Sequence, residues 1–301
     1  MFYLIFGQYL VNNHILTKDI FATLQHKVAN SKVRLGIIAV SEGLLTSIQA
    51  EELNRLQAVK DIRFGDLAVE RGYLTEEQVS SLLKLQGNTF LQFVQLLIDE
   101  ACLTMEDINK YMKSYQEDYH LSDSQMTILK TGDFDSILPI LISVPSALYF
   151  DHLALVLRNI VRFISNDFYI LNCKKIDSFE AEHIAMQQMT GSHDITLGFA
   201  ATSNHLLSIA NPFAKEDFAA VGDDAYDSVC EFINCINGIY ATKLSENGVH
   251  VELLPPTSNY KQLVRGAKLY ILSLAIEGHP VDLFISIDSP MEFSKEVRLD
   301  G

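Results

Sequence analysis

Apolar and polar positions recur at helical spacing along residues 223–248 and predict one long amphipathic helix. At about 100° per residue, one side of this helix gathers four apolar side chains, Val229, Ile233, Ile236 and Tyr240. The opposite side gathers two carboxylates, an amide and a glycine, Asp227, Glu231, Asn234 and Gly238. Acidic residues at 223 and 224 mark the start of the helix, and Asn247-Gly248 marks a left-handed stop. The pattern therefore places a compact polar patch on the side that faces away from the core.

The hydrophobic pattern of residues 146–301 as a whole predicts an α+β domain with helices packed on a mainly antiparallel sheet. Residues 151–165 carry the apolar stripe of a helix, and a further helix is expected around residues 204–211. Short apolar runs predict strands at 180–190, 193–202, 249–254, 268–277 and 281–287. Gly191-Ser192 separates the first two strands, and Gly278-His279-Pro280 joins the last two.

The first hundred-odd residues repeat with a fixed period. A Leu-Thr pair recurs with its threonine at Thr17, Thr46, Thr75 and Thr104, each 29 residues after the one before, and Gly7, Gly36 and Gly65 keep the same step. Each unit predicts a helix, a stop and a second helix, which begins in the clearest units with the capping boxes Thr46-x-x-Gln49 and Thr75-x-x-Gln78. Stacked helix pairs of this length bury one another's apolar faces. The sequence therefore predicts an all-α array of four 29-residue helix-pair repeats over residues 1–116.

Residues 117–145 differ from both neighbours because they carry acidic residues, a glycine and two prolines. A short helix capped by Ser122 is expected at residues 122–130, whereas Pro139 and Pro145 exclude a long one. We therefore divide the chain into a repeat domain at 1–116, a connector at 117–145 and a second domain at 146–301.

Composition and charge narrow the function classes. With 301 residues, 48% of them hydrophobic, the chain has enough apolar side chains for two packed domains. A formal net charge of −15 argues against binding to the phosphate backbone of nucleic acids, because such binding depends on Lys and Arg. Residues 1–11 lack the basic region and cleavage site of a signal peptide, and residues 137–150 are too short and too proline-rich to span a membrane. We therefore expect a cytoplasmic protein without a membrane segment.

Neither the cysteines nor the histidines show a spacing typical of a metal or redox site. The cysteines contain no CxxC pair, and all four are expected to be reduced and buried: Cys102, Cys173, Cys230 and Cys235. The nine histidines form no HExxH motif and no cluster with cysteine at metal-binding spacing. No metal site is therefore expected.

The polar patch on the long helix can act on an electrophile without a nucleophilic side chain. The carboxylate of Glu231 can pair with a cation, and the carboxamide of Asn234, one turn away, can donate and accept and so hold a water molecule. Gly238 on the same side would let a backbone or a phosphate-bearing loop approach closely. The alternative interpretation is the ordinary solvated face of an amphipathic helix.

Glu231-x-x-Asn234, preceded by Asp227 and followed by Gly238 and Pro255-Pro256, resembles the helix motif of the CheC/CheX/FliY phosphatases of bacterial chemotaxis, and CheX most of all. The resemblance covers roughly residues 146–290 and implies a CheX/CheC-like α/β sandwich. It implies that Asn234 positions the attacking water in the active site of a phosphorylated CheY-like response regulator. Glu231 would pair with the regulator's active-site lysine, and Asp227 and Gly238 would contact this partner.

The same resemblance bears on cofactors, copy number and assembly. It implies no cofactor of the chain's own, since Mg²⁺ would be held by the partner regulator. Relatives such as CheC and FliY carry a second motif on their first helix, but this chain has Leu157-Arg158-Asn159 there without a Glu-x-x-Asn, so one site per chain is expected. CheX-like relatives dimerise through their sheet, which implies a homodimer through the C-terminal sheet.

The N-terminal repeats resemble the N-terminal domain of type II secretion ATPases such as GspE, and more narrowly the MshE-type version that binds cyclic di-GMP. The narrower resemblance rests on two tandem copies, residues 34–57 and 63–86, that begin Arg-[Leu/Phe]-Gly and end in Gln. It implies a cyclic di-GMP site made of Arg34, Leu35, Gly36, Gln57, Arg63, Gly65, Asp66 and Gln86. The first and fourth repeats lack the Arg and the terminal Gln and are assigned to capping. The alternative is that these residues are the ordinary consensus of a helical repeat that docks proteins.

With these resemblances, the sequence predicts a chemotaxis-type signalling protein: a phosphatase of a phosphorylated CheY-like response regulator, regulated or localised by the N-terminal array. Two alternatives stay open. In one, the same surface docks onto a receiver domain or onto a secretion or pilus component without hydrolysis. In the other, the protein is primarily a cyclic di-GMP effector whose output domain only binds.

Overall fold

The computed structural model describes residues 1–28, 30–60, 62–165 and 167–295, and the chain forms two compact units, Met1–Ile137 and Leu138–Gly301. The division falls inside the segment that the sequence suggests as a connector, residues 117–145. Each unit has its own cluster of buried apolar side chains. Among the described residues, no helix is both long enough and apolar enough to cross a membrane.

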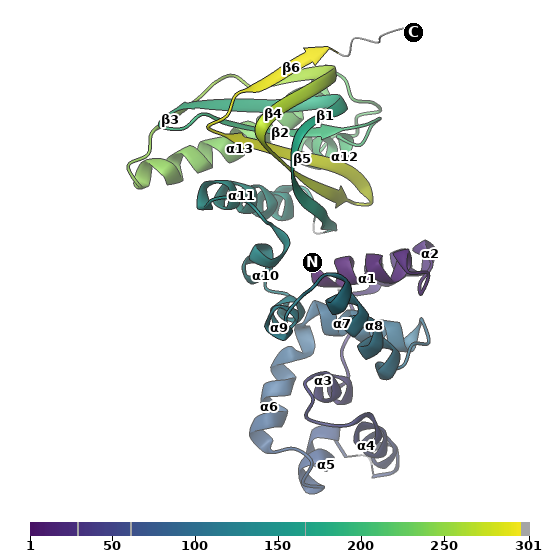
Figure 1. Ribbon diagram of the computed structural model, residues 1–301. Coiled ribbons are helices and arrows are strands. Elements are labelled where there is room, and N and C mark those ends of the chain that lie inside the picture. Colours follow the sequence, from purple (N-terminus) through teal and green to yellow (C-terminus); the bar gives the residue numbers. More distant parts are fainter. Residues whose placement is uncertain (29, 61, 166, 296–301) are drawn as a thin grey trace. The chain divides into compact units, whose positions relative to one another are not determined.

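The first unit is built from helices joined by short turns (Figure 1). In chain order they are α1 (Phe2–Asn12), α2 (Lys18–Val28), α3 (Leu35–Ser41), α4 (Ser47–Lys60), α5 (Phe64–Glu70), α6 (Glu76–Lys84), the 3₁₀ turn η1 (Leu85–Gly87), α7 (Thr89–Asp99), α8 (Met105–Asp118) and α9 (Asp123–Thr131). Helices α1, α3, α5 and α7 end at residues 12, 41, 70 and 99, and helices α2, α4, α6 and α8 begin at residues 18, 47, 76 and 105. Both sets of helix ends therefore keep the 29-residue step of the sequence.

The capping boxes predicted from the sequence are present. The Thr75 hydroxyl accepts from the backbone N–H of Gln78 at 3.2 Å, and the Gln78 side chain accepts from the N–H of Thr75 at 2.8 Å. Thr46 and Gln49 make the same pair of bonds, at 3.2 and 2.9 Å. Two further boxes, Thr104 with Asp107 and Ser122 with Gln125, begin α8 and α9. These local bonds satisfy backbone N–H groups that have no partner in the first turn of a helix.

Helix α7 is buried along most of its length, from Phe90 to Leu97. It contacts α1, α2 and α3, so the fourth repeat packs against the first and second repeats. Its two buried amides are used: Gln92 donates to the carbonyl of Ser31 at 3.1 Å, and Gln95 accepts from the N–H of Arg34 at 3.0 Å. A helix that is buried along most of its length belongs in a core. The assignment of the fourth repeat to capping is therefore wrong for α7, which supplies a central helix.

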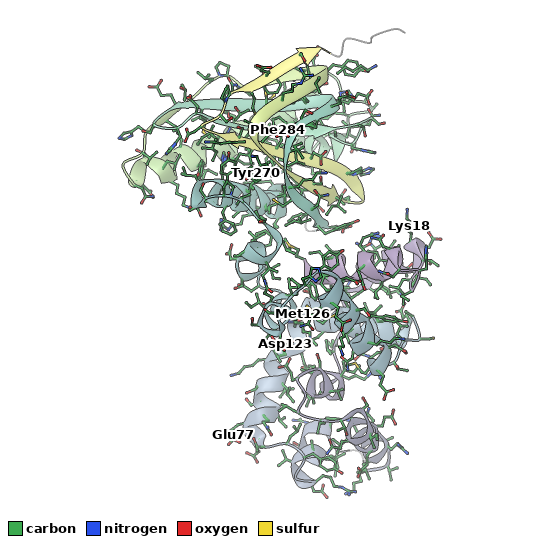
Figure 2. The ribbon with its side chains drawn as sticks, in the orientation of Figure 1. Lys18, Glu77, Asp123, Met126, Tyr270 and Phe284 are labelled. Atoms are coloured by element: carbon green, nitrogen blue, oxygen red, sulfur yellow. The ribbon has the colours of Figure 1, made fainter. Side chains whose placement is uncertain are left out.

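Residues 117–145 contain more helix than a connector implies. The predicted short helix is α9, and it begins at Ser122 as expected. It is tied to the first unit, because Asn88 donates to the carbonyls of Lys130 and Thr131 at 2.8 and 3.0 Å, and Met126 is buried (Figure 2). A further helix, α10 (Phe134–Leu141), includes Pro139 and is only 8 residues long, as a helix with an internal proline should be.

The second unit combines helices with an antiparallel sheet (Figure 1). Its elements are α11 (Ala147–Phe163), β1 (Phe168–Gly191), β2 (Ile195–Ala201), α12 (Leu207–Ala214), α13 (Asp223–Glu246), β3 (Val251–Leu253), β4 (Thr257–Ile276), β5 (His279–Ile287) and β6 (Met291–Lys295). Every pairing among the described strands is antiparallel, which confirms the predicted helix-plus-antiparallel-sheet class.

Four strands of this sheet form a closed ring. The order is β3-β1-β2-β5-β4-β6, and β1 also pairs with β4 along most of its length. Going from β1 through β2, β5 and β4 therefore returns to β1. Register shifts between Ile170 and Asn172 and between Ile176 and Ser178 bend β1 so that it can close the ring.

The sheet is buried on both faces along β2 and most of β5. One face packs against the helices, as the stacked rings of Phe199 on β2 and Phe232 on α13 show, with centroids 6.0 Å apart. The other face encloses a second apolar cluster that includes Phe284 of β5 (Figure 2). A Cβ at Gly198 would lie 2.4 Å from the Phe284 ring, so only glycine fits opposite this side chain.

Two strands are longer than the sequence indicates, and one was not foreseen. β1 begins at residue 168 instead of 180, β4 begins at residue 257 instead of 268, and β6 was not predicted. The additional part of β1 pairs mainly with the predicted part of β4, and the additional part of β4 pairs mainly with the predicted part of β1. Both additional parts carry many polar residues, so their alternation is weak. Their pairing depends on chain that lies far away in sequence, which a local pattern does not contain.

The cysteine prediction is wrong in part. All four are free thiols, but Cys102 and Cys235 are exposed, Cys173 is half-buried, and only Cys230 is buried. Cys102 lies in the turn between α7 and α8 with a positive φ of 56°, and Cys235 lies on the outward side of α13. The described residues contain no group of three or more His, Cys, Asp or Glu side chains arranged to hold a metal ion.

Candidate functional site

Helix α13 presents its two sides as the hydrophobic pattern predicts. The four apolar side chains of its inner side are all at most 1% exposed: Val229, Ile233, Ile236 and Tyr240. The helix begins with Asp223 and Asp224 in its first turn, and Gly248, with φ of 76°, takes the left-handed conformation just after its end. It packs against α11, α12 and β1. This packing fixes the direction in which the opposite side faces.

The outer side of α13 carries the predicted polar patch. Asp227, Glu231 and Asn234 are exposed, and Gly238 is half-buried. Among the described residues, Asp227 and Glu231 form no hydrogen bond or ion pair, so both carboxylates face solvent. A Cβ at Gly238 would meet no atom within 4 Å, so packing inside the chain does not require a glycine there. The patch is therefore a surface of two unpaired carboxylates, one amide and open space.

Asn234 differs from the carboxylates because a buried residue holds its side chain. Nε2 of Gln187, a β1 residue that is 1% exposed, donates to Oδ1 of Asn234 at 2.7 Å. The same nitrogen donates to the carbonyl of Leu254 at 2.8 Å. A carbonyl oxygen has two lone pairs, so Oδ1 keeps one, and the two N–H groups of Asn234 remain for a second partner.

Behind Gln187 the hydrogen bonds continue into the core. Nδ2 of Asn237 donates to Oε1 of Gln187 at 2.9 Å, and Oδ1 of Asn237 lies 2.8 Å from Nε2 of His152 on α11. The His152 ring is fully buried and stacks on Tyr240 with centroids 4.0 Å apart. Burial lowers the pKa of His152 to about 3, against the opposing effect of the hydrogen bond to Asn237, so the imidazole is neutral.

An apolar rim borders the patch. Ile239 on α13 is 46% exposed. Leu254, whose carbonyl accepts from the same Gln187 nitrogen as Asn234, is 41% exposed. Cys235 is exposed one turn after Glu231. On the buried side of the helix, burial and then the charge of Asp227 raise the pKa of the Cys230 thiol to about 11, so this cysteine stays protonated. The site therefore combines negative charge, an anchored amide and exposed apolar side chains.

Residues 183–265 match the family model described as Chemotaxis phosphatase CheX. This CheX-like region runs from the second half of β1 to the middle of β4 and contains all of α13, including the patch. It also contains Gln187 and Leu254, whereas His152 lies outside it. No curated protein matches the chain.

Several solved structures resemble the part of the chain that holds the CheX-like region. A CheX from Desulfovibrio desulfuricans is 11% identical, with 47% of this chain and 99% of that chain covered and a TM-score of 0.41. A CheX from Vibrio vulnificus is 13% identical, with 47% and 99% covered and a TM-score of 0.39. The CheX of a CheX–CheY–BeF₃–Mg²⁺ complex from Borrelia burgdorferi is 17% identical, with 46% and 95% covered and a TM-score of 0.37.

Sequence reasoning missed the residues that stand behind the patch. Gln187, Asn237 and His152 are buried polar residues in otherwise apolar surroundings. The signal was present for Asn237, which lies one turn from Asn234 at the border of the two helix sides. For Gln187 and His152 no local signal exists, because their contacts join β1, α11 and α13.

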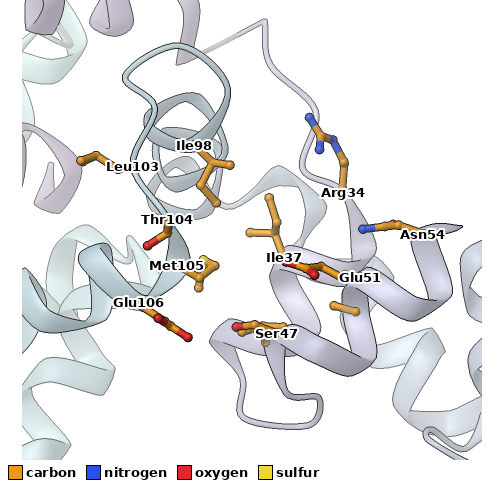
Figure 3. Close-up of a pocket in the computed structure, with 13 residues that line it drawn as sticks. Arg34, Ile37, Ser47, Glu51, Asn54, Ile98, Leu103, Thr104, Met105 and Glu106 are labelled. Carbon is orange, nitrogen blue, oxygen red and sulfur yellow. The ribbon is translucent and has the colours of Figure 1, made fainter.

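The eight residues proposed for cyclic di-GMP do not all lie at one cavity. The first unit has a cavity of about 470 Å³, and of the eight only Arg34 and Gly36 line it (Figure 3). The guanidinium of Arg34 pairs with Asp99 at 2.5 Å. Across the cavity lie residues of α8 and the segment before it, including Thr104, Met105 and Glu106 (Figure 3).

The other six of these residues are placed as follows. Arg63, Asp66, Gln57 and Gln86 are exposed, and Gln86 donates to the carbonyl of Val33 at 3.2 Å. Leu35 is half-buried, and Gly65 is buried. A Cβ at Gly65 would lie 2.8 Å from Val79 and 3.5 Å from Leu35, so packing alone accounts for this glycine.

Proposed function

We propose that the chain is a phosphatase of a phosphorylated CheY-like response regulator, with Asn234 and Glu231 as its catalytic side chains. The observation that carries this proposal is that both residues lie exposed, one turn apart, on a helix inside the CheX-like region. A merely solvated helix face would not need an exposed amide held by a buried glutamine. The anchored amide is what the proposed chemistry requires.

Each residue of the patch has a role in this proposal. The free lone pair of Asn234 Oδ1 accepts from a water molecule and directs its oxygen at the phosphoryl group of the regulator. Glu231, which has no partner among the described residues, pairs with a lysine of the regulator. Asp227 and the open surface at Gly238 contact the partner, and Ile239 and Leu254 supply apolar contact area. Mg²⁺ belongs to the regulator in this scheme, and the chain needs no cofactor of its own.

Dephosphorylation of a panel of purified, phosphorylated CheY-type regulators tests the proposal. At least one regulator should lose its phosphoryl group faster with the full-length protein than alone. Asn234→Ala and Glu231→Ala should each lower this acceleration about 10²-fold or more. Glu246→Ala, which removes an exposed glutamate from the last turn of the same helix, should leave it intact. Full activity of both patch variants would refute the assignment of the site.

The adaptor alternative has its own signature in the same experiment. A regulator that binds the full-length protein tightly but keeps its phosphoryl lifetime would identify a docking protein. A receiver-domain partner of either kind would imply a cytoplasmic protein.

We also propose a homodimer through the C-terminal sheet. Analytical ultracentrifugation of the full chain over a range of concentrations tests it, and a monomer at every concentration would exclude it.

For the first unit we propose a regulatory or docking module similar to the N-terminal domain of GspE. The cavity at Arg34 and Gly36 favours a small ligand, and cyclic di-GMP is the candidate that the resemblance implies. Calorimetry of the full chain with cyclic di-GMP should show binding that Arg34→Ala removes, while Arg55→Ala, at an exposed arginine of α4, retains it. Absence of heat at high micromolar ligand would leave a protein-docking module.

Regulation of the site by this module is a separate step of the proposal. A ligand that favours one arrangement of the two units must shift its population, with a coupling of about 1 to 3 kcal/mol. Removing residues 1–120 should therefore change phosphatase activity severalfold. Equal rates for full-length and shortened protein, with and without cyclic di-GMP, would show that the module does not regulate the site.

A further inference from the structure

The backbone carbonyl of Leu254 fixes the orientation of a row of hydrogen-bonded side chains. This row runs from His152 through Asn237 and Gln187 to Asn234. A backbone carbonyl can only accept, so the end of Gln187 that faces it at 2.8 Å must be the NH₂ group. The second hydrogen of that nitrogen then points at Asn234, 2.7 Å away. Asn234 must therefore turn its oxygen inward. One backbone group thus fixes which atoms of Asn234 face outward.

The same logic runs inward from Gln187. Its oxygen faces Asn237 and must accept, so Asn237 presents its NH₂ group there, at 2.9 Å. The oxygen of Asn237 then faces His152, whose Nε2 must carry the proton, at 2.8 Å. Within the part of the chain that the structure describes, Nδ1 of this neutral ring is buried without a hydrogen-bond partner, which is compatible with the unprotonated nitrogen of this tautomer. Every bond in the row donates in one direction, from α11 through α13 and β1 to the surface of α13.

Each member of the row is held on more than one side. His152 stacks on Tyr240, whose hydroxyl donates to the carbonyl of Leu148 at 2.9 Å. Gln187 and Asn237 are 1% and 0% exposed, so neither amide can turn toward water. Hydrogen bonds that donate in one direction strengthen one another in a buried setting. Reversing any amide would set two acceptors or two donors against each other, which is costly where water cannot enter.

We propose that Gln187 is the positioning residue of the site, and that Asn237 and His152 hold it in the orientation that fixes the Asn234 carboxamide. This inference rests on the proposed function, because it assigns Gln187 a part in orienting the catalytic amide. Gln187 itself does not reach the surface. It acts by preventing a 180° flip of the Asn234 carboxamide. One lone pair of Oδ1 and both N–H groups of Asn234 therefore always face the partner.

The test compares Gln187→Met with a matched control, Gln262→Met. Gln262 is a buried glutamine of the same sheet, on β4, and among the described residues its side chain bonds only to the carbonyl of Tyr260, at 3.4 Å, outside the row. In Gln187→Met, kcat for the phosphorylated regulator should fall roughly 10- to 100-fold, the scale known when outer partners of metal ligands are removed, with KM unchanged. Gln262→Met should keep the wild-type kcat.

A second mutant separates positioning from mere stability. In the Asn234→Ala background, Gln187→Met should cause no further loss of kcat, because the group that it orients is gone. An equal additional loss in both backgrounds would overturn the proposal. If Gln187→Met does not fold, His152→Phe replaces it, since this variant keeps the ring against Tyr240 and removes only the donor to Asn237. It should lower kcat in the same direction by a smaller factor.

Nuclear magnetic resonance spectroscopy of the full chain tests the inference without a measurement of phosphatase activity. The side-chain NH₂ protons of Gln187 should exchange slowly, and the NH₂ signals of Asn234 should shift in Gln187→Met and His152→Phe but not in Gln262→Met. Fast exchange of the Gln187 NH₂ protons, or Asn234 signals that stay unchanged in both variants, would overturn the positioning role. If no regulator is dephosphorylated while these signals behave as stated, the proposed function fails and the row of amides stands.

Discussion

Asn159 of helix α11 and Asn234 of helix α13, both in the second unit, differ in their surroundings and in what holds their side chains. Asn159 on α11 is 5% exposed and donates to the carbonyl of Leu155 at 2.8 Å, inside its own helix. Asn234 on α13 is exposed and is held by Gln187 from a different element. An asparagine is available to a partner when it lies at the surface and its anchor comes from elsewhere. The amino-acid type alone does not distinguish the buried asparagine from the available one.

The two helices also divide the work of the site. Helix α11 supplies His152, the first donor of the row, while its buried side packs against the sheet and the Tyr149 hydroxyl donates to the carbonyl of Lys268 at 3.0 Å. Helix α13 supplies both the outer patch and the middle of the row, through Asn237. The difference predicts that mutations on α11 act mainly on stability and mutations on the outer side of α13 mainly on activity.

The strongest test of this division replaces each asparagine. Asn234→Ala should lower phosphatase activity about 10²-fold or more. Its stability should change little, because Asn234 is exposed and water can replace it as the acceptor for Gln187. Asn159→Ala should keep the activity and lose about 1 kcal/mol of unfolding free energy, the value of one hydrogen bond. Regulator dephosphorylation and urea denaturation measure the two effects. A comparable loss of activity in both variants would break the comparison.

His152 gives α11 a contribution to stability that depends on pH. Its folded pKa of about 3 lies below the ordinary value of 6.5, so between these values the unfolded chain binds a proton that the folded chain does not. The stability contributed by neutral His152 is complete above pH 6.5 and is lost as the pH falls toward 3, by up to about 1.4 kcal/mol per pH unit. Urea denaturation from pH 7 to pH 4 should show a shallower decline for His152→Phe than for the wild type. Parallel curves would contradict this.

The smallest expected effect concerns Gly238. Alanine at this position meets no atom within 4 Å and should stabilise the helix by about 0.5 to 1 kcal/mol, because glycine is unfavourable inside helices. If a partner approaches this surface closely, the same substitution should raise KM for the phosphorylated regulator severalfold. Thermal denaturation and steady-state kinetics measure both quantities. A stabilised variant with an unchanged KM would remove Gly238 from the partner-binding surface.

The parts of the molecule that depend on neighbours in sequence could be predicted. Threonine caps, the step of the helix ends and the two sides of α13 follow from residues a few positions apart, and the structure has them where the sequence indicates. The full lengths of β1 and β4 and the strand β6 depend on pairings across long separations, and they were missed. The site divides in the same way. The patch is a periodic pattern on one helix, whereas Gln187 and His152 join it only through the tertiary fold.

The closed ring of strands has a consequence for the order of folding. Phe168 at the start of β1 pairs with Ile276 at the end of β4, so the chain between them, including all of α13, must be in place before the ring can close. Contacts between such distant residues are slow to form, whereas the helix pairs of the first unit rely on short loops. During synthesis the first unit can fold before β4, the partner of the first half of β1, has been made. We therefore expect refolding to have a fast helical phase and a slow sheet phase, and the proposed site to be assembled only in the second.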